Sequence, residues 1–140
     1  MNKTIIFVGG GSLGHVAKHV AVYPYIKNDF DKFIFIGSEG GLEKEYLKGR
    51  FPFEALPVAK FDRVHMSRNL TLPIDLFKAI KKAKEILKRE EPAVIFCGGG
   101  FTCVPVAIAA KSLKIPVVLH ESDYSLGLAN RLSLPFAKGF

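Results

Sequence analysis

The first glycine-rich segment, residues 9–14, constrains the fold of this chain more than any other stretch. It follows residues 4–8, a β-branched and aromatic run that is typical of a buried parallel strand. Residues 16–26 come next, with apolar side chains at helical spacing. A strand, a glycine turn and a helix in this order aim backbone N–H groups and the positive end of the helix dipole at an anion. The Gly-x-Gly-x-x-Gly pattern is weak by itself, so a tight turn that binds nothing stays open as the alternative.

Composition narrows the class of protein. The 140 residues are 49% hydrophobic and 24% charged, which suits one domain with a real core and excludes a disordered chain. We expect neither a signal peptide nor a membrane span, because the apolar runs are too short. Cys97 and Cys103 fit neither a common zinc pattern nor a disulfide scaffold, which favours a reducing cytoplasm. The net charge of +7 leaves nucleic acid, anionic lipid and phosphorylated substrates open as partners.

The rest of the chain continues the alternation of strands and helices. We expect further strands at residues 33–36, 53–58, 93–97 and 115–119. We expect further helices at residues 42–48, 73–89, 104–113 and 126–134, and a long loop at residues 59–70. Gly37 and Ser38 are expected to stop the second strand, and Thr102 to cap the helix at 104–113. This alternation predicts an α/β, Rossmann-like parallel sheet with helices on both faces and right-handed crossovers.

A second glycine run, residues 98–100, follows the predicted strand 93–97. In the common strand order 3-2-1-4-5, that strand lies beside residues 4–8 at the topological switch point, where ligands bind outside the carboxyl ends of the strands. Both glycine runs then leave neighbouring strands. Two facing sets of backbone N–H groups hold a pyrophosphate better than one set does. The pairing therefore favours a phosphate-bearing ligand over two structural turns.

Titratable side chains flank the two glycine runs. His15 falls at the start of a helix, where the dipole disfavours the charged imidazole, so it is either a general base or a residue that only caps or packs. His120 and Glu121 follow the predicted strand 115–119, where side chains reach the ligand crevice. Asp123 lies two residues further on and is also a good helix N-cap residue.

Other function classes fit the sequence less well. A P-loop is excluded, because no Gly-Lys-Ser or Gly-Lys-Thr ends the first glycine run. A dinucleotide site needs an acid at the end of the second strand, where Glu39 is only an approximate candidate. The basic residues form no RRM, KH or helix-turn-helix signature. His19 and His65 have no companion motif and are expected at the surface, and no histidines are paired at metal-ligand spacing.

The predicted helix 73–89 combines an apolar stripe with basic residues. The stripe consists of Leu76, Phe77, Ile80, Ala83 and Leu87. The basic side consists of Lys78, Lys81, Lys82, Lys84, Lys88 and Arg89. A solvated helix face is the ordinary explanation. The alternative is a membrane-facing patch that docks on an anionic leaflet, made of Leu72, Leu76, Phe77, Ile80, Lys78 and Lys81.

Three segments resemble the N-terminal domain of the MurG-type glycosyltransferases, which belong to glycosyltransferase family 28. They are residues 10–15 (Gly-Gly-Ser-Leu-Gly-His), residues 99–105 (Gly-Gly-Phe-Thr-Cys-Val-Pro) and residues 115–123 (Ile-Pro-Val-Val-Leu-His-Glu-Ser-Asp). Gly-Leu-Ala-Asn at residues 127–130 follows the third, and residues 37–43 resemble the segment after the second strand. The resemblance runs from residue 2 to the end of the chain with the order and spacing of the motifs kept.

The resemblance implies a function and a set of site residues. The family's enzymes add N-acetylglucosamine from UDP-N-acetylglucosamine to an undecaprenyl-pyrophosphoryl muramyl-pentapeptide, with inversion, on a two-domain GT-B fold. It implies that His15 is the general base on the acceptor hydroxyl. The residues implied to hold the acceptor pyrophosphate are Gly10, Gly11, Ser12, Leu13, Gly14, Gly99 and Gly100. The residues implied to lie near the sugar are His120, Glu121, Asp123 and Asn130. No metal or cofactor is expected.

The resemblance also sets the expected domain organisation and location. Residues 1–140 would form the acceptor-binding half of the GT-B fold, without the C-terminal donor-binding domain, and would be inactive alone. We expect a cytoplasmic protein on the inner face of the cell membrane, whose partners are the lipid-linked acceptor, anionic lipid and, with a C-terminal domain or subunit, UDP-N-acetylglucosamine. Nucleic acid is not an expected partner. Two alternatives stay open: a non-catalytic subunit that binds a lipid- or nucleotide-linked sugar for a catalytic partner, and a dinucleotide-binding oxidoreductase domain.

Overall fold

The computed structural model describes residues 3–9, 14–38, 47, 49, 51–57, 72–98 and 102–120, with the backbone alone at 14–16, 38, 72, 73 and 75. The elements in chain order are β1 (Thr4–Val8), α1 (Gly14–Ile26), β2 (Lys32–Ser38), β3 (Phe53–Leu56), α3 (Leu72–Glu90), β4 (Val94–Cys97), α4 (Cys103–Ser112) and β5 (Val117–Leu119). The predicted loop 59–70, the predicted helix 126–134 and, apart from residue 47, the predicted helix 42–48 lie outside the described residues.

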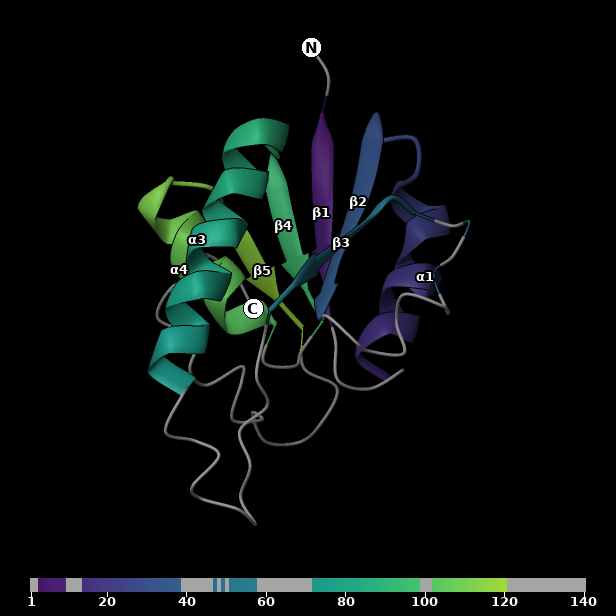
Figure 1. Ribbon diagram of the computed structural model, residues 1–140. Helices are drawn as coiled ribbons and strands as arrows, with labels where there is room; N and C mark the ends of the chain where they lie inside the picture. The colour runs from purple at the N-terminus through teal and green to yellow at the C-terminus, as the bar shows by residue number, and fades with distance from the viewer. Residues whose placement is uncertain are drawn as a thin grey trace.

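The strands form one parallel sheet in the order β3-β2-β1-β4-β5, which confirms the predicted topology. Figure 1 shows α1 on one side of this sheet and α3 and α4 on the other. In the pairing of the two central strands, Ile5 lies opposite Val94 and Val8 lies opposite Cys97. β1 and β4 therefore end in step, at the same edge of the sheet.

Several element boundaries differ from those expected of the local sequence. β2 continues through Gly37 and Ser38, which were expected to stop it, because these residues pair with Ala55 and Leu56 of β3. β3 ends at Leu56 and β5 begins at Val117, so both are shorter than the sequence pattern suggests. Pairing with the neighbouring strand, more than local propensity, sets where a strand ends.

The face under α3 and α4, the aliphatic face, is built from branched aliphatic and small side chains. Its strand residues include Ile6, Val8, Ile34, Ile36, Ile95, Cys97 and Leu119. Its helix residues include Ala83, Ile86, Leu87, Cys103, Val106, Ala107 and Ala110. Small residues allow the two helices to pack closely against each other and against the sheet.

The face under α1, the aromatic face, is built mainly from rings. Ile5, Phe7, Phe35 and Leu47 are buried there, and Val20, Ile26, Phe30, Phe33, Phe51, Phe53, Val94 and Phe96 pack around them. The Phe7 ring lies 5.6 Å from the ring of Phe51 in an edge-on arrangement, and Phe35 stacks on Phe53 at 6.0 Å. Such arrangements add a favourable ring–ring term to the burial of apolar area.

The buried side of α3 differs in part from the predicted stripe. Ala79, Ala83, Ile86 and Leu87 are buried. Phe77 was assigned to the stripe, yet its side chain is 69% exposed. A stripe of small and aliphatic residues fits against α4 and the sheet, and Phe77 lies about 135° from the centre of this stripe around the helix axis.

Thr102 does not play its predicted part at the start of α4. It occupies the N-cap position and is buried, but its side chain makes no capping hydrogen bond. Its φ of −59° and ψ of −30° are already helical. A side-chain cap usually requires an extended backbone at this position.

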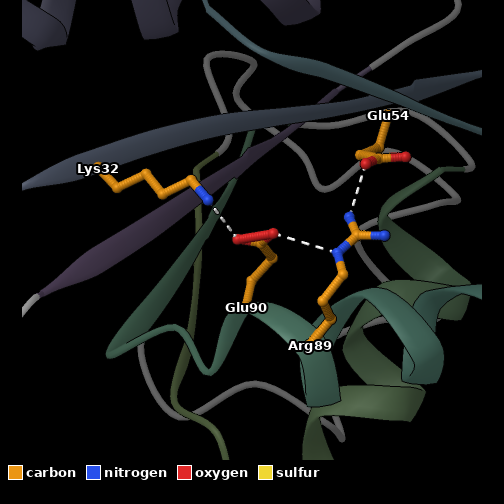
Figure 2. Close-up of polar contacts among 4 residues, drawn as sticks. All are labelled: Lys32, Glu54, Arg89 and Glu90. Carbon is orange, nitrogen blue, oxygen red and sulfur yellow. Dashed lines mark hydrogen bonds and ion pairs between the residues drawn. The ribbon is translucent and has the colours of Figure 1, made fainter.

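Charged residues join the end of α3 to β2 and β3 (Figure 2). Lys32 Nζ lies 2.8 Å from Glu90 Oε2. Arg89 Nη2 lies 2.6 Å from Glu54 Oε1, and Arg89 Nε lies 3.1 Å from Glu90 Oε1. The hydrogen bond from Lys32 is the main cause that holds the pKa of the Glu90 carboxyl below its ordinary value. Because Lys32 and Arg89 are about half exposed, this network contributes modestly to stability.

Candidate functional site

The carboxyl edge of the sheet holds the first residues of both glycine runs side by side. Gly98 N donates a hydrogen bond to Val8 O at 2.8 Å, and Gly9 N donates to Ile36 O at 3.2 Å. His120 N donates to Cys97 O at 2.9 Å. The backbone hydrogen bonds between strands therefore continue one residue beyond β1, β4 and β5. The chain leaves these three neighbouring strands at the same level along the edge of the sheet.

Two helices begin close after these exits. α1 begins at Gly14, two residues earlier than its apolar pattern indicates, and α4 begins at Cys103. The first turns of both helices leave backbone N–H groups without partners inside the helix, and these groups carry the positive end of the dipole. The backbone of Gly14 and His15 thus belongs to the first turn of α1, as predicted for His15.

The structure describes few of the predicted site residues near this edge. Gly10, Gly11, Ser12, Leu13, Gly99, Gly100, Glu121, Asp123 and Asn130 lie outside the described residues. His120 is described: it is exposed, it follows β5 directly, and its ring lies 6.1 Å from the ring of Phe96. The structure therefore brings His120 and the start of α1 to the same edge of the sheet.

His19 was expected at the surface, and this prediction is wrong. Its side chain is fully buried on the aromatic face. The imidazole lies edge-on to Phe7 at 5.0 Å, Phe35 at 5.1 Å and Phe96 at 5.3 Å between ring centroids. Its Nε2 lies 3.4 Å from the backbone oxygen of Phe96. The helical spacing of the sequence could have predicted this burial, because position 19 falls on the same helix face as the apolar positions 16, 20 and 23.

The two cysteines are buried together on the aliphatic face, next to the carboxyl edge. Cys103 Sγ lies 3.8 Å from the backbone oxygen of Val8. The hydrogen bond to Cys103, together with burial, raises the pKa of the Cys97 thiol well above its ordinary value. A buried thiol that stays protonated is a poor nucleophile, so Cys97 has no features of a catalytic cysteine.

The exposed face of α3 carries both apolar and basic residues. Ile74 is 59% exposed and Phe77 is 69% exposed, and Lys78 and Lys81 are exposed close by on the helix. Ile80, which the sequence placed in the membrane-facing patch, instead packs partly against the core. Leu76 is half-buried, and the side chain of Leu72 is outside the described part of the chain. In the described ranges, no helix is both long enough and apolar enough to cross a bilayer.

Among the described residues, this edge offers the first-turn N–H groups of α1 and α4 and the exposed side chain of His120. Among the side chains that the structure describes, no group of three or more His, Cys, Asp or Glu residues lies close enough to hold a metal ion. Backbone N–H groups and helix N-termini are well suited to phosphate oxygens. The described geometry is therefore suited to an anion at the switch point of a doubly wound parallel sheet.

This architecture is one half of a GT-B fold, and comparison with known sequences gives the family. Residues 5–140 match the N-terminal domain of glycosyltransferase family 28. The match spans nearly the whole chain, and the chain belongs to this family.

Individual relatives agree with the family. The chain is 45% identical over 133 residues to the UDP-N-acetylglucosamine--N-acetylmuramyl-(pentapeptide) pyrophosphoryl-undecaprenol N-acetylglucosamine transferase of Clostridium botulinum, covering 94% of this chain and 37% of that protein. It is 41% identical over 138 residues to the enzyme of the same name from Staphylococcus saprophyticus, covering 96% and 38%. The chain thus spans less than two fifths of the length of these curated relatives.

Solved structures agree with the fold. MurG of Acinetobacter baumannii matches with a TM-score of 0.83 and 25% identity, over 97% of this chain and 40% of that one. A UDP-N-acetylglucosamine 2-epimerase matches with a TM-score of 0.68 over 100% of this chain and 42% of that one. At 16% identity the epimerase shares the fold alone.

Proposed function

We propose that this chain is the acceptor-binding N-terminal part of an enzyme that transfers N-acetylglucosamine from UDP-N-acetylglucosamine to an undecaprenyl-pyrophosphoryl muramyl-pentapeptide. The family and the names of its relatives support this activity. The observation that carries the proposal is the side-by-side exit of the two glycine runs from β1 and β4, with Gly98 N bonded to Val8 O. Two neighbouring sets of amide donors would suit a pyrophosphate. Both the acceptor and the UDP-sugar carry one, and the family resemblance favours the acceptor for this domain.

The acceptor pyrophosphate would lie across both glycine runs. Gly10, Gly11, Ser12, Leu13 and Gly14 would contact it from the first run, and Gly99 and Gly100 from the second. The start of α1 adds dipole stabilisation for the negative charge. His120, Glu121, Asp123 and Asn130 would lie toward the sugar, since His120 follows the neighbouring strand β5.

His15 would act as the general base in a direct displacement. The acceptor hydroxyl attacks the anomeric carbon of the donor sugar while the bond from that carbon to the UDP oxygen breaks. The hydroxyl proton passes to the imidazole of His15, and UDP leaves with the electron pair. The place of His15 in the first turn of α1 supports this role, because the dipole there favours the neutral imidazole that a base requires.

His15→Ala separates catalysis from binding in a complete enzyme, made by joining the chain to the C-terminal domain of the Clostridium botulinum relative. We expect turnover to fall by about 10²- to 10⁴-fold, the usual contribution of a general base, with acceptor affinity nearly unchanged. His65→Ala is the matched control and should leave turnover near wild type. Wild-type turnover in His15→Ala would overturn the assignment of the base.

Isothermal titration of the 140-residue chain with a short-prenyl, water-soluble analogue of the acceptor tests the substrate itself. We expect binding that Gly99→Val abolishes and that UDP-N-acetylglucosamine does not compete with. Failure to bind the acceptor analogue would contradict the proposal. Acceptor binding without transfer in the completed enzyme would instead indicate a non-catalytic binding subunit.

A lipid-linked acceptor also requires contact with the membrane surface. We propose that the exposed face of α3, with Ile74 and Phe77 among Lys78 and Lys81, rests on the cytoplasmic leaflet. Each basic residue near an anionic leaflet contributes on the order of 1 kcal/mol, and the two apolar side chains add burial in the interface. We expect the chain to co-sediment with phosphatidylglycerol-containing vesicles, and less so at high salt or after Lys78→Gln with Lys81→Gln. Equal binding to neutral vesicles would contradict an electrostatic contribution.

A further inference from the structure

On each face of the sheet, a buried polar side chain from a helix contacts the backbone of one of the two central strands. His19 belongs to α1, which follows β1, and its Nε2 reaches the backbone oxygen of Phe96 on β4 at 3.4 Å. Cys103 belongs to α4, which follows β4, and its Sγ reaches the backbone oxygen of Val8 on β1 at 3.8 Å. Both side chains are fully buried. The contacts are reciprocal, because each helix bonds to the strand that leads into the other glycine run.

The chemistry of each contact fixes which atom donates. A carbonyl oxygen only accepts hydrogen bonds, so His19 carries its proton on Nε2 and Cys103 donates its S–H. Three rings, those of Phe7, Phe35 and Phe96, surround the imidazole at 5.0 to 5.3 Å and hold it in place. Phe96 lies two residues before Gly98, which opens the second glycine run, and Val8 lies one residue before Gly9, which opens the first.

We infer that His19 and Cys103 are positioning residues that hold α1 and α4, the helices that follow the two glycine runs, in place against the strand ends from which those runs leave at Gly98 and Gly9. Most of each helix is held against the sheet by apolar packing, which is not directional, whereas a hydrogen bond is. The contact of His19 with β4 positions α1 relative to the strand end from which the second glycine run leaves. The contact of Cys103 with β1 positions α4 relative to the strand end from which the first glycine run leaves. The inference rests on the proposed function, in which both runs hold the same pyrophosphate.

Paired substitutions separate positioning from simple packing. His19→Leu fills a similar volume without a donor, whereas His19→Gln keeps an N–H donor and loses the ring. Cys103→Ala removes the S–H donor, whereas Cys103→Ser keeps a donor of nearly the same size. If packing alone matters, His19→Leu should resemble wild type and His19→Gln should be the poorer variant. If the hydrogen bond positions the helix, His19→Gln should resemble wild type and His19→Leu should be the poorer variant.

Amide hydrogen exchange of the 140-residue chain, followed by NMR, is the first measurement because it needs no ligand. We expect His19→Leu to speed exchange at Gly98, and Cys103→Ala to speed exchange at Gly9, each by about fivefold, the size expected of one neutral hydrogen bond. The variants that keep a donor should exchange as wild type does. Long-range ¹H–¹⁵N spectra should also show the imidazole of His19 protonated on Nε2.

Titration with the short-prenyl acceptor analogue is the second measurement. We expect the two donor-deleting variants to bind more weakly than their donor-keeping partners by about fivefold. A proton on Nδ1 alone, or exchange changes confined to the helix that carries the substitution, would overturn the inference. Changed exchange at Gly98 and Gly9 with no binding by the wild-type chain would support the contacts and overturn the proposed function instead.

Discussion

The two faces of the sheet are packed by different means. The aliphatic face lies under α3 and α4 and consists of branched and small side chains. Of the described helices, only α1 lies on the aromatic face, where phenylalanine rings fill the space between one helix and the sheet (Figure 1). Alternate residues of each strand serve opposite faces, so Ile6 belongs to the first and Phe7 to the second.

The difference shows how one strand can satisfy two kinds of packing. Close approach of two helices needs small side chains such as Ala83 and Ala107. On the other face large rings fill the space under α1, and the polar ring of His19 is enclosed among them. On each face one enclosed polar side chain, His19 or Cys103, contacts one of the last two residues of a central strand, close to the proposed site.

The largest expected effect comes from Phe7→Ala on the aromatic face. The Phe7 ring contacts the rings of His19, Phe33, Phe51 and Phe96. We expect the free energy of unfolding to fall by about 3–5 kcal/mol in urea denaturation, because a cavity forms and several ring contacts are lost. Ile6→Val on the opposite face is the control and should cost about 0.5–1.5 kcal/mol. A loss below about 2 kcal/mol for Phe7→Ala would show that the rings repack.

Cys97, on the aliphatic face, should cause the free energy of unfolding to fall in alkaline solution. Its pKa is raised in the folded chain, so the folded state keeps this proton after the unfolded state has lost it. Stability is fully present below the unfolded thiol pKa of about 8.5 and falls as pH rises above it, by up to about 1.4 kcal/mol per pH unit. Urea denaturation between pH 7 and pH 10 should show this slope reduced in Cys97→Ala. An unchanged slope would mean that other groups dominate alkaline unfolding.

The smallest effect should come from the charged rim beside α3. Glu90→Gln should lower the free energy of unfolding at pH 7 by less than about 1 kcal/mol, because the ion pairs are partly exposed. The lowered pKa of Glu90 means that its contribution is present above an unfolded pKa of about 4.3 and is lost as pH falls below it. The difference from wild type should therefore vanish at pH 2. Glu85→Gln, an exposed change on the same helix, is the control and should leave the free energy of unfolding at pH 7 close to that of wild type.

Much of the fold could be predicted because its signals are local. Apolar runs, glycine turns and helical periodicity placed every described strand and helix within a few residues, and the alternation led to the strand order that the structure shows. Of the candidate site, the neighbouring exits of the two glycine runs and the place of His15 in a first helical turn were also predictable. The roles of the site residues stay predictions.

The sequence by itself determined the order of elements, the two glycine runs and the family, because these depend on residue type and spacing along the chain. Tertiary structure decided that His19 is enclosed by rings, that Phe77 faces outward and that β2 runs on through Ser38. Each of these depends on what another segment places opposite the residue. A histidine on a helix is buried or exposed according to the strands beneath it, and here Phe7, Phe35 and Phe96 come from three different strands.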